Sequence, residues 1–211
     1  MSIEQFGQDP DGATPLTDDD FVGLKPKWVA NRSDLNLAEA QNISEAFEKY
    51  FRSRMALEGI LDDMFVRKLH TDMYSDVWTW AGAYRITETS IGVAPHRISQ
   101  DVKVLMENAR YWFDSNNPTD IDEAACKVHH KLVQIHPFRN GNGRMTRMFA
   151  DLLLISVGQP AFSWGGGDLD SVSPTRDTYM RALRVADTGD YSLLNQFVRT
   201  TSISLTNKDG A

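Results

Sequence analysis

Apolar side chains recur at intervals of three and four residues along the first half of the chain, and this spacing predicts helices. One run begins near Asn36, and a second extends from Ile60 to Val77, with a break expected at Gly59. We therefore expect two successive helices ahead of Trp78. The apolar positions are Leu37, Ile43, Phe47, Tyr50, Phe51 and Leu57 in the first run, and Leu61, Met64, Phe65, Leu69 and Met73 in the second.

The same periodicity predicts two helices in the middle of the chain. Val102, Leu105, Met106, Ala109 and Phe113 mark the first, which the sequence Asn116-Asn117-Pro118 should stop. Thr119 is expected to cap the second, with Asp122 as a short version of a capping-box acid. This second helix delivers the chain to His136.

Three further helices are predicted in the last third of the chain. Residues 144–157 are strongly amphipathic. A flexible connection is expected at Trp164 to Gly167, where three glycines follow a tryptophan. Pro174 at a helix start and Asp190 as a cap then place two helices near the C-terminus.

Two segments depart from the helical pattern. Tyr84 to Pro95, YRITETSIGVAP, is β-branched and interrupted by glycine, which is typical of a short hairpin or extended flap. Residues 1–33 are rich in Asp, Pro, Gly and Thr, so we expect an irregular N-terminal arm. The predicted architecture is an all-α bundle over residues 34–205, with one short β excursion and this arm.

Composition narrows the class of protein. The chain has 211 residues, of which 41% are hydrophobic, so it can bury a core. Its net charge of −7 should repel nucleic acid and anionic lipid. A single cysteine fits a reducing compartment, and no signal peptide or membrane-spanning apolar run is visible. We therefore expect a cytoplasmic protein that binds neither nucleic acid nor membrane.

The sequence HPFRNGNGR, from His136 to Arg144, reads as a loop between two helices because its glycines and proline disfavour both helix and strand. It lies in a stretch from Glu123 to Asp151 that contains basic residues and no acidic residue between its ends. A basic site in an acidic protein favours a small anionic ligand. The basic residues are Lys127, Lys131, Arg139, Arg144 and Arg147.

The residue types in this loop suit phosphate chemistry. Glycines directly before a helix let main-chain N–H groups converge on an anion, and the helix dipole assists them. Arg144 and Arg147 are three residues apart, so both guanidinium groups can reach one polyphosphate. His136 enters from the other side of the loop and could take a proton from an attacking hydroxyl.

The loop also resembles the signature of Fic (Fido) domain proteins, His-Pro-Phe-x-Asp/Glu-Gly-Asn-Gly-Arg-x-x-Arg, through residues 136–144 and Arg147. Similarity extends from about Ile60 to Phe197 and includes the segment VWTWAGAYR at 77–85 followed by Ile91-Gly92. Residues 12–16, GATPL, are similar to the branch of the family labelled mobile mystery protein B.

The resemblance implies a Fic-type helical bundle that transfers AMP from ATP to a Ser, Thr or Tyr hydroxyl of a target protein. It implies that His136 is the general base, and that Phe138 packs inward and anchors the loop. Phe138 and Asn140 count among the nucleotide-binding residues that it implies. It further implies an anion hole formed by Gly141, Asn142 and Gly143, phosphate binding by Arg144 and Arg147, and main-chain docking of the target on a flap formed by Thr89, Ser90, Ile91, Gly92 and Val93.

One position departs from the signature, because Asn140 stands where the family has an acid that binds Mg²⁺. An amide oxygen can coordinate Mg²⁺ but brings no charge. Two hypotheses therefore stay open: an adenylyltransferase of full or reduced activity, and a catalytically weak or silent module that binds nucleotide or a partner.

Other motifs carry less weight. Ser53 to Gly59, SRMALEG, looks like the inhibitory helix of some Fic proteins, but Arg54 stands where a hydroxyl is needed. We therefore expect any inhibitor to be a separate, antitoxin-like protein. His129, His130 and His136 lack the cysteine pair or His-Glu-x-x-His pattern of a zinc site. Cys126, Trp78 and Trp80 are expected in the core.

Overall fold

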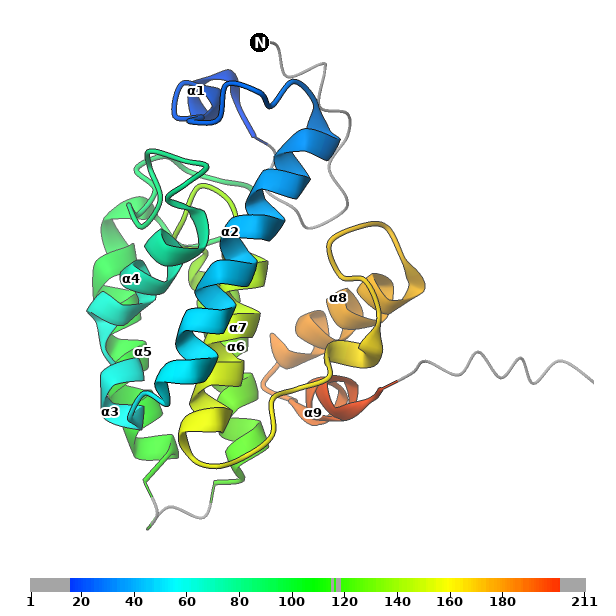
Figure 1. Ribbon diagram of the computed structural model, residues 1–211. Helices are drawn as coiled ribbons and strands as arrows, with labels where there is room; N and C mark the ends of the chain where they lie inside the picture. Colours follow the sequence, from blue (N-terminus) through cyan, green and yellow to red (C-terminus); the bar gives the residue numbers. More distant parts are fainter. Residues whose placement is uncertain (1–15, 115, 117–118, 202–211) are drawn as a thin grey trace, which may run out of the picture. The chain divides into compact units, whose positions relative to one another are not determined.

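The computed structural model describes residues 16–114, 116 and 119–201. Residues 16–161 form one compact unit, and residues 162–201 form a second, smaller one. Each unit is helical, which confirms the predicted all-α class. Figure 1 shows the helices of both units.

The first unit contains the helices that carry the motif loop. Buried Leu, Phe, Met and Val side chains from its longer helices make up its core. The elements are α1 (Asp18–Phe21), α2 (Arg32–Ser53), α3 (Leu57–Ile60), α4 (Asp63–Tyr74), η2 (Pro95–Arg97), α5 (Ile98–Trp112), α6 (Ile121–Ile135) and α7 (Asn142–Ser156).

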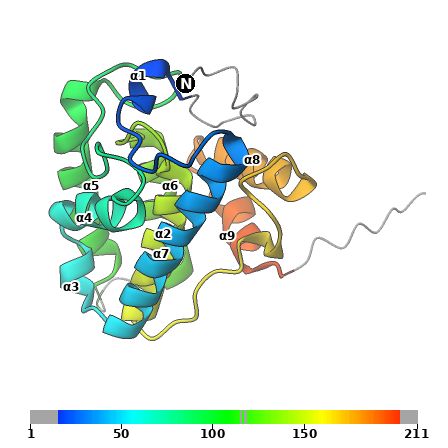
Figure 2. The same cartoon turned by 45° about the horizontal axis from the view of Figure 1, so that its top comes forward.

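Helices α6 and α7 form an antiparallel pair, and the motif loop joins them. Helix α5 packs on α6, and α4 packs on both α5 and α7. The long helix α2 lies across α4 and α7, as Figures 1 and 2 both show. The loop is therefore held at the end of a packed pair and has α2 and α4 close to it.

Polar caps set the starts of three of these helices. Asn31 accepts a hydrogen bond from the N–H of Asp34 at α2, and Asp62 accepts one from Met64 at α4. At α6 the cap is Asp120, whose carboxylate accepts hydrogen bonds from the N–H groups of Asp122 and Glu123. The expected cap at Thr119 is thus wrong by one residue, because the adjacent aspartate supplies the stronger acceptor. The stop expected at Asn117-Pro118 lies outside the described residues.

The segment Tyr84 to Pro95 is not the hairpin that its composition suggests. Among the described residues the structure has an isolated bridge between Leu24 and Trp78, and no strand within this flap. Its main-chain N–H groups at Arg85 and Val93 instead donate to Pro137 and Ile135, at 2.9 and 3.3 Å. The expected hairpin is corrected for this reason: the flap pairs with the start of the motif loop and not with itself.

The described part of the expected arm, residues 16–33, is more ordered than its composition suggests. Thr17 and Asp20 form a capping box around α1, and Leu16 and Val29 are buried. The N–H of Lys25 donates to Val77 at 2.9 Å, and that of Thr79 donates to Gly23 at 2.8 Å. These long-range main-chain bonds fix the segment, and composition does not reveal them. Residues 12–15, which carry part of the branch resemblance, lie outside the described residues.

The second unit consists of η3 (Trp164–Gly166), α8 (Pro174–Ala186) and α9 (Ser192–Arg199). Pro174 occupies the first turn of α8 as predicted, with Ser173 as the cap. The connection expected to be flexible is an ordered turn: Gly165 has φ +74°, and a Cβ there would lie 2.6 Å from Phe197. Asp190 precedes the cap of α9, Tyr191, and accepts from the N–H of Ser192 at 2.9 Å.

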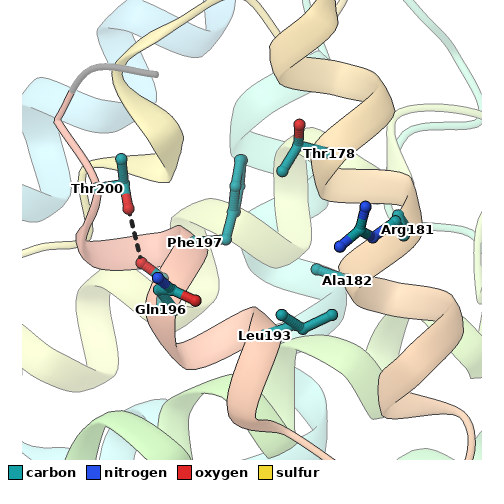
Figure 3. Close-up of a pocket in the computed structure, with 7 residues that line it drawn as sticks. All are labelled: Thr178, Arg181, Ala182, Leu193, Gln196, Phe197 and Thr200. Atoms are coloured by element: carbon teal, nitrogen blue, oxygen red, sulfur yellow. Dashed lines mark hydrogen bonds between the residues drawn. The ribbon is translucent and has the colours of Figure 1, made fainter. Parts of the chain in front are cut away.

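A cavity of about 220 Å³ lies between α8 and α9 in the second unit. Figure 3 shows Phe197, Ala182 and Leu193 around it, together with polar side chains at its edge. Its lining includes no residue of the motif loop, so we do not assign it to the candidate site. The seven residues that line it are Thr178, Arg181, Ala182, Leu193, Gln196, Phe197 and Thr200.

Candidate active site

The candidate site is the loop between α6 and α7, and His136 is its first residue. His136 ends α6 in the left-handed region, with φ 52° and ψ 61°, while its N–H still donates to Leu132 at 3.0 Å. Histidine is among the side chains that enter this region more readily than most. The turn directs the chain out of α6 and toward the start of α7.

The imidazole of His136 is held in its neutral form. Burial and, to a smaller extent, the nearby charge of Arg85 lower the pKa of His136 to about 4, although a hydrogen bond with the backbone of Val133 opposes them. Only 5% of the residue is exposed. At neutral pH the ring therefore has an unprotonated nitrogen, as a general base requires.

Asn142 shapes the loop with its side chain. Its Oδ1 accepts from the N–H of Phe138 at 2.9 Å, and its Nδ2 donates to the carbonyl of Phe138 at 2.8 Å. The residue is almost fully buried. The Asn142 amide, expected at the nucleotide, is thus committed to closing the loop on itself.

Phe138 anchors this closed loop in the core. Its ring is fully buried and stacks on His70, with centroids 3.8 Å apart and planes at 21°. Tyr84 lies on another side, at 5.5 Å between centroids. The ring supports the loop from within the core, and none of its surface is exposed.

His70 on α4 holds the loop from below and was missed in the sequence. Its Nδ1 accepts from the N–H of Gly82 at 3.0 Å, which leaves the proton on Nε2, 3.0 Å from the carbonyl oxygen of Asn140. Complete burial lowers the pKa of His70 to about 3, so the ring stays neutral. Its position on the apolar face of α4, next to Leu69, was the available signal.

Gly141 and Gly143 serve different purposes. Gly141 caps α7 with φ +76°, and a Cβ there would lie 2.5 Å from Cζ of Tyr74. At Gly143 a Cβ would meet only Nη1 of Arg147, at an ordinary 3.5 Å. Packing and backbone geometry therefore require a glycine at 141, whereas the protein itself leaves room for a methyl group at 143.

The first turn of α7 supplies the main-chain part of the expected anion hole. The cap, Gly141, has no side chain to accept hydrogen bonds from this turn, which leaves its N–H groups to other acceptors. The N–H of Gly141 itself donates to Oδ1 of Asn140 at 2.6 Å. The hole is therefore smaller than the sequence suggests and rests on the residues after Gly141.

Arg144 is paired with a buried carboxylate from α2. Its Nη2 lies 2.7 Å from Oε2 of Glu39, and the indole N–H of Trp78 donates to the other oxygen of Glu39 at 2.7 Å. The guanidinium also lies over the ring of Tyr74, 5.3 Å from its centroid. Glu39 was not predicted, because an acid in the middle of a helix usually faces solvent.

The basic stretch of the sequence is not a basic patch in space. Asp20 of α1 lies 3.1 Å from Nη1 of Arg139, and Glu123 lies 2.6 Å from Nζ of Lys127. Together with Glu39 at Arg144, these acids offset much of the local charge. The expectation is corrected because α1 and α2 supply Asp20 and Glu39, and Glu123 at the end of the stretch pairs with Lys127 one turn later on α6.

Arg147 lies one turn after Arg144 on α7 and is half-buried. Its charge acts on His129 of α6, whose pKa is lowered to about 3, mainly by burial. Both His129 and His130 are buried in the first unit. In the described part of the chain, no three His, Cys, Asp or Glu side chains gather as a metal site.

The residues present do not form a protein-held Mg²⁺ site at Asn140. Its Oδ1 already accepts the short hydrogen bond from Gly141, and it carries no charge. Mg²⁺ prefers anionic oxygen and an octahedral shell. We derive no role for a metal held by this side chain.

The flap brings its expected target-binding residues beside the start of the loop. Gly92 has φ +113°, and a Cβ there would lie 2.8 Å from Cβ of His136. Thr89 Oγ1 donates to the carbonyl of Ile91 at 2.6 Å, which shapes the tip. Ser90 and Ile91 are exposed, and Val93 is half-buried. The flap therefore borders His136 and presents its tip outward.

The segment Ser53 to Gly59 covers the end of α2, the turn after it and the first part of α3. Arg54 ends α2 in the left-handed region, and Glu58 is exposed on α3. No helix among the described residues has the length and apolar character needed to cross a membrane.

Comparison with known proteins agrees with this geometry. Residues 60–154 match the Fic/DOC family. Protein adenylyltransferase fic-1 of Caenorhabditis elegans is 32% identical over 127 residues, which cover 56% of this chain and 22% of that protein. Protein adenylyltransferase Fic of Drosophila grimshawi is 30% identical over 120 residues, covering 56% and 23%. The chain thus spans less than a quarter of the length of these relatives.

Solved structures share the fold. The N-terminal Fic domain of a putative cell filamentation protein from Bartonella quintana, with bound ADP, has a TM-score of 0.62 at 19% identity and covers 94% of both chains. The BepC protein of Bartonella tribocorum, with bound AMPPNP, has a TM-score of 0.60 at 18% identity, covering 94% of this chain and 96% of that one. The family match, the loop and the fold agree, and the part of the chain over residues 60–154 is a Fic (Fido) domain.

Proposed function

We propose that the chain is a protein adenylyltransferase that moves AMP from ATP to a hydroxyl side chain of a target protein. The observation that carries the proposal is the placement of a neutral, buried imidazole and a helix N-terminus without a side-chain cap at opposite ends of one short loop, residues 136–141. Relatives named protein adenylyltransferase, and neighbours with bound ADP and AMPPNP, support it.

The chemistry assigns one role to His136. The target's hydroxyl oxygen forms a bond to the α-phosphorus of ATP, and the bond from that phosphorus to the bridging oxygen of the β-phosphate breaks. Pyrophosphate leaves with the electron pair of that bond. The imidazole takes the proton from the attacking hydroxyl, which is general-base catalysis worth roughly 10²–10⁴-fold in rate.

The start of α7 holds the phosphates. Its main-chain N–H groups point to the anion, and Gly143 leaves room for close approach. Arg147 and Arg144 add charge, with Arg144 oriented by Glu39 and Tyr74. The Glu39 carboxylate also offsets part of that charge, so nucleotide binding is weaker than two unpaired arginines would give.

A second candidate function is a nucleotide-binding or partner-binding module with weak or no catalysis. Asn140 in place of an acid favours it, as does the pairing of Arg144 with Glu39. Any Mg²⁺ would enter with the nucleotide and rest on its phosphates. Comparing ATP affinity with and without Mg²⁺ in the wild type and in Asn140→Asp measures what the missing carboxylate contributes.

The partners follow from the flap and the site. A target segment with a Ser, Thr or Tyr hydroxyl docks on Thr89 to Val93, beside His136. A separate antitoxin-like protein is the proposed inhibitor, because Glu58 lies exposed on α3. We place the reaction in the cytoplasm, where ATP and reduced cysteine coexist.

Two parallel labelling reactions test the proposed transfer. The protein is incubated with a bacterial lysate and ATP that carries radioactive phosphorus in either the α or the γ position. We expect a labelled protein band from α-labelled ATP and none beyond background from γ-labelled ATP. His136→Ala should abolish the band while ATP affinity in calorimetry stays unchanged, and the exposed His96→Ala serves as the matched control.

Each result has a defined meaning. Label from the γ position would indicate phosphoryl transfer and contradict the proposal. ATP binding without any labelled band, across lysates and in Asn140→Asp, would favour the silent module. A band that persists in His136→Ala would remove His136 from the role of base.

A further inference from the structure

Arg85 is the feature that the proposed mechanism does not use. Its side chain is among the largest that are fully buried, with 2% of the residue exposed. A buried guanidinium is costly unless its donors are satisfied. Burial lowers the pKa of Arg85, and Glu88, whose charge acts in the opposite direction, is an exposed neighbour on the flap.

The guanidinium donates to main-chain carbonyls of two different segments. Nε donates to His136 at 2.7 Å, and Nη2 reaches Ile135 at 3.4 Å, both at the end of α6. Nη1 donates to Thr87 at 2.9 Å, and Nη2 also donates to Val93, both in the flap. One planar side chain thus binds two stretches about fifty positions apart in the sequence.

Main-chain hydrogen bonds reinforce this connection between the flap and the end of α6, which we call the junction. The N–H of Arg85 donates to Pro137 at 2.9 Å, and the N–H of Val93 donates to Ile135 at 3.3 Å. A rigid guanidinium fork can hold several acceptors in fixed directions, whereas an ammonium is a single flexible point. The junction therefore requires the shape of arginine as well as its charge.

Gly92 completes the contact from the flap side. A Cβ at this residue would lie 2.5 Å from Nη2 of Arg85 and 2.8 Å from Cβ of His136, and φ is +113°. The flap can approach both residues this closely only because it has a glycine there. The contact among Gly92, Arg85 and His136 therefore fixes the position of the flap relative to His136.

We infer that Arg85 is a positioning residue that joins the flap and His136 into one unit, so that a target segment docked on the flap presents its hydroxyl at the imidazole. This inference rests on the proposed adenylyl transfer for its catalytic consequence. Its structural part, the junction itself, can be measured without activity. Arg85 does not touch the nucleotide-binding turn of α7, so the inference also predicts unchanged ATP affinity in its variants.

The test uses Arg85→Lys and Gly92→Ala in the full chain, with Arg97→Gln as the matched control. Arg97 lies just after the flap, but its side chain is exposed and pairs with Asp101 at 3.1 Å. For the two test variants we expect faster amide hydrogen exchange in residues 85–93 and 135–136, by at least about tenfold. Turnover should fall by roughly 10²-fold, the cost of a displacement of about 1 Å, with the KM for ATP unchanged. The control should change none of these.

The outcomes separate the junction from the proposed function. Unchanged exchange in folded Arg85→Lys and Gly92→Ala overturns the inference, and so does faster exchange with normal turnover. A loss of ATP affinity equal to the loss of turnover also overturns it, because that would indicate general damage. If the wild type transfers nothing, the proposed function fails, and the exchange data still decide whether the junction exists. If Arg85→Lys does not fold, Gly92→Ala decides.

Discussion

The motif loop and the flap are both irregular, yet they are stabilised in opposite ways. The loop is closed by its own Asn142 and anchored by Phe138 and His70 in the core. The flap makes its main-chain bonds to residues about fifty positions away, and its tip is exposed. The loop is thus built to keep one shape, whereas the flap keeps its base fixed and leaves its tip to meet another molecule.

This difference explains why one segment is easier to read than the other. The contacts that shape the loop are local, so its glycines, its proline and its asparagines indicate its conformation. The flap's constraints come from Arg85 and Ile135, and its own composition suggests a hairpin that the structure does not contain. Local shape is visible in sequence, and long-range pairing is not.

Lowering the pH should produce the largest effect, a fall in the free energy of unfolding. It should act through buried histidines, among them His70 and His136 at the motif loop. The pKa values of His70, His129 and His136 are lowered to about 3, 3 and 4 in the folded state, against about 6.5 when unfolded. The unfolded chain therefore binds more protons below about pH 6.5, and stability falls as pH falls toward 4. Each histidine lowers the free energy of unfolding by up to about 1.4 kcal/mol per pH unit. The three together lower it by up to roughly 4 kcal/mol per pH unit.

Denaturant unfolding at pH 7.5, 6.5 and 5.5 measures this loss. His96→Asn, at an exposed position next to the flap, is the matched control variant. Stability that stays constant over this range would show that the three imidazoles are not held neutral by the fold.

The two loop glycines should separate folding from ligand binding. Gly141→Ala meets both a left-handed backbone and the ring of Tyr74, so we expect a loss of roughly 2–4 kcal/mol in unfolding free energy. Gly143→Ala meets no close atom and gains up to about 1 kcal/mol from helix propensity. Its methyl group would stand where phosphate approaches, so ATP affinity should fall at least about tenfold. Equal ATP affinity in Gly143→Ala and wild type would place the phosphates elsewhere.

The pair formed by Glu39 and Arg144 should give effects of opposite sign. Arg144→Ala should weaken ATP binding by roughly 1.5–3 kcal/mol, because it removes a charged hydrogen-bond donor. Glu39→Gln keeps one acceptor oxygen, which can serve either Trp78 or Arg144, and it removes a negative charge. Binding should therefore strengthen by about 1 kcal/mol, a factor of about 5. Isothermal calorimetry at one salt concentration measures both. Weaker binding in Glu39→Gln would mean that orientation of Arg144 outweighs the charge.

The flap tip should give the smallest effect on stability. Ser90 is exposed, so Ser90→Ala should change the unfolding free energy by no more than about 0.5 kcal/mol. Main-chain docking predicts that target modification is also nearly unchanged, whereas Ser90→Pro should reduce it by removing a donor. Thermal melts and the labelling assay report the two quantities. Equal losses of labelling in both variants would indicate that the side chain, and not the main chain, binds the target.

Much of the fold could be predicted from the sequence. The periodic apolar positions indicated the longer helices, and the prolines and glycines marked several of their ends, because these signals act over one or two turns. Residues 16–33 were misjudged because their order comes from contacts with Val77 and Thr79. The break expected at Gly59 lies instead between α2 and α3, where Arg54 adopts a left-handed conformation.

The candidate site could be predicted only in its loop. His136 and the glycines are close together in the sequence, so they had to lie close together in the structure. Glu39, His70 and Arg85 come from three other segments, and a single sequence carries no record of which helix faces pack together. The apparent basic stretch failed for the same reason, since Asp20 and Glu39 arrive from the N-terminal third of the chain.

The stacked indoles of Trp78 and Trp80 give this protein an internal optical reporter. Their rings lie 4.9 Å apart at 25°, close enough to couple in near-ultraviolet circular dichroism. Trp78 donates to the Glu39 carboxylate, which also pairs with Arg144. Trp80 donates to the main-chain carbonyl of Asp20, whose carboxylate pairs with Arg139. Any ligand that draws either arginine away from its acid alters the electric field at an indole. The protein's own fluorescence should therefore register events in the loop without an attached dye.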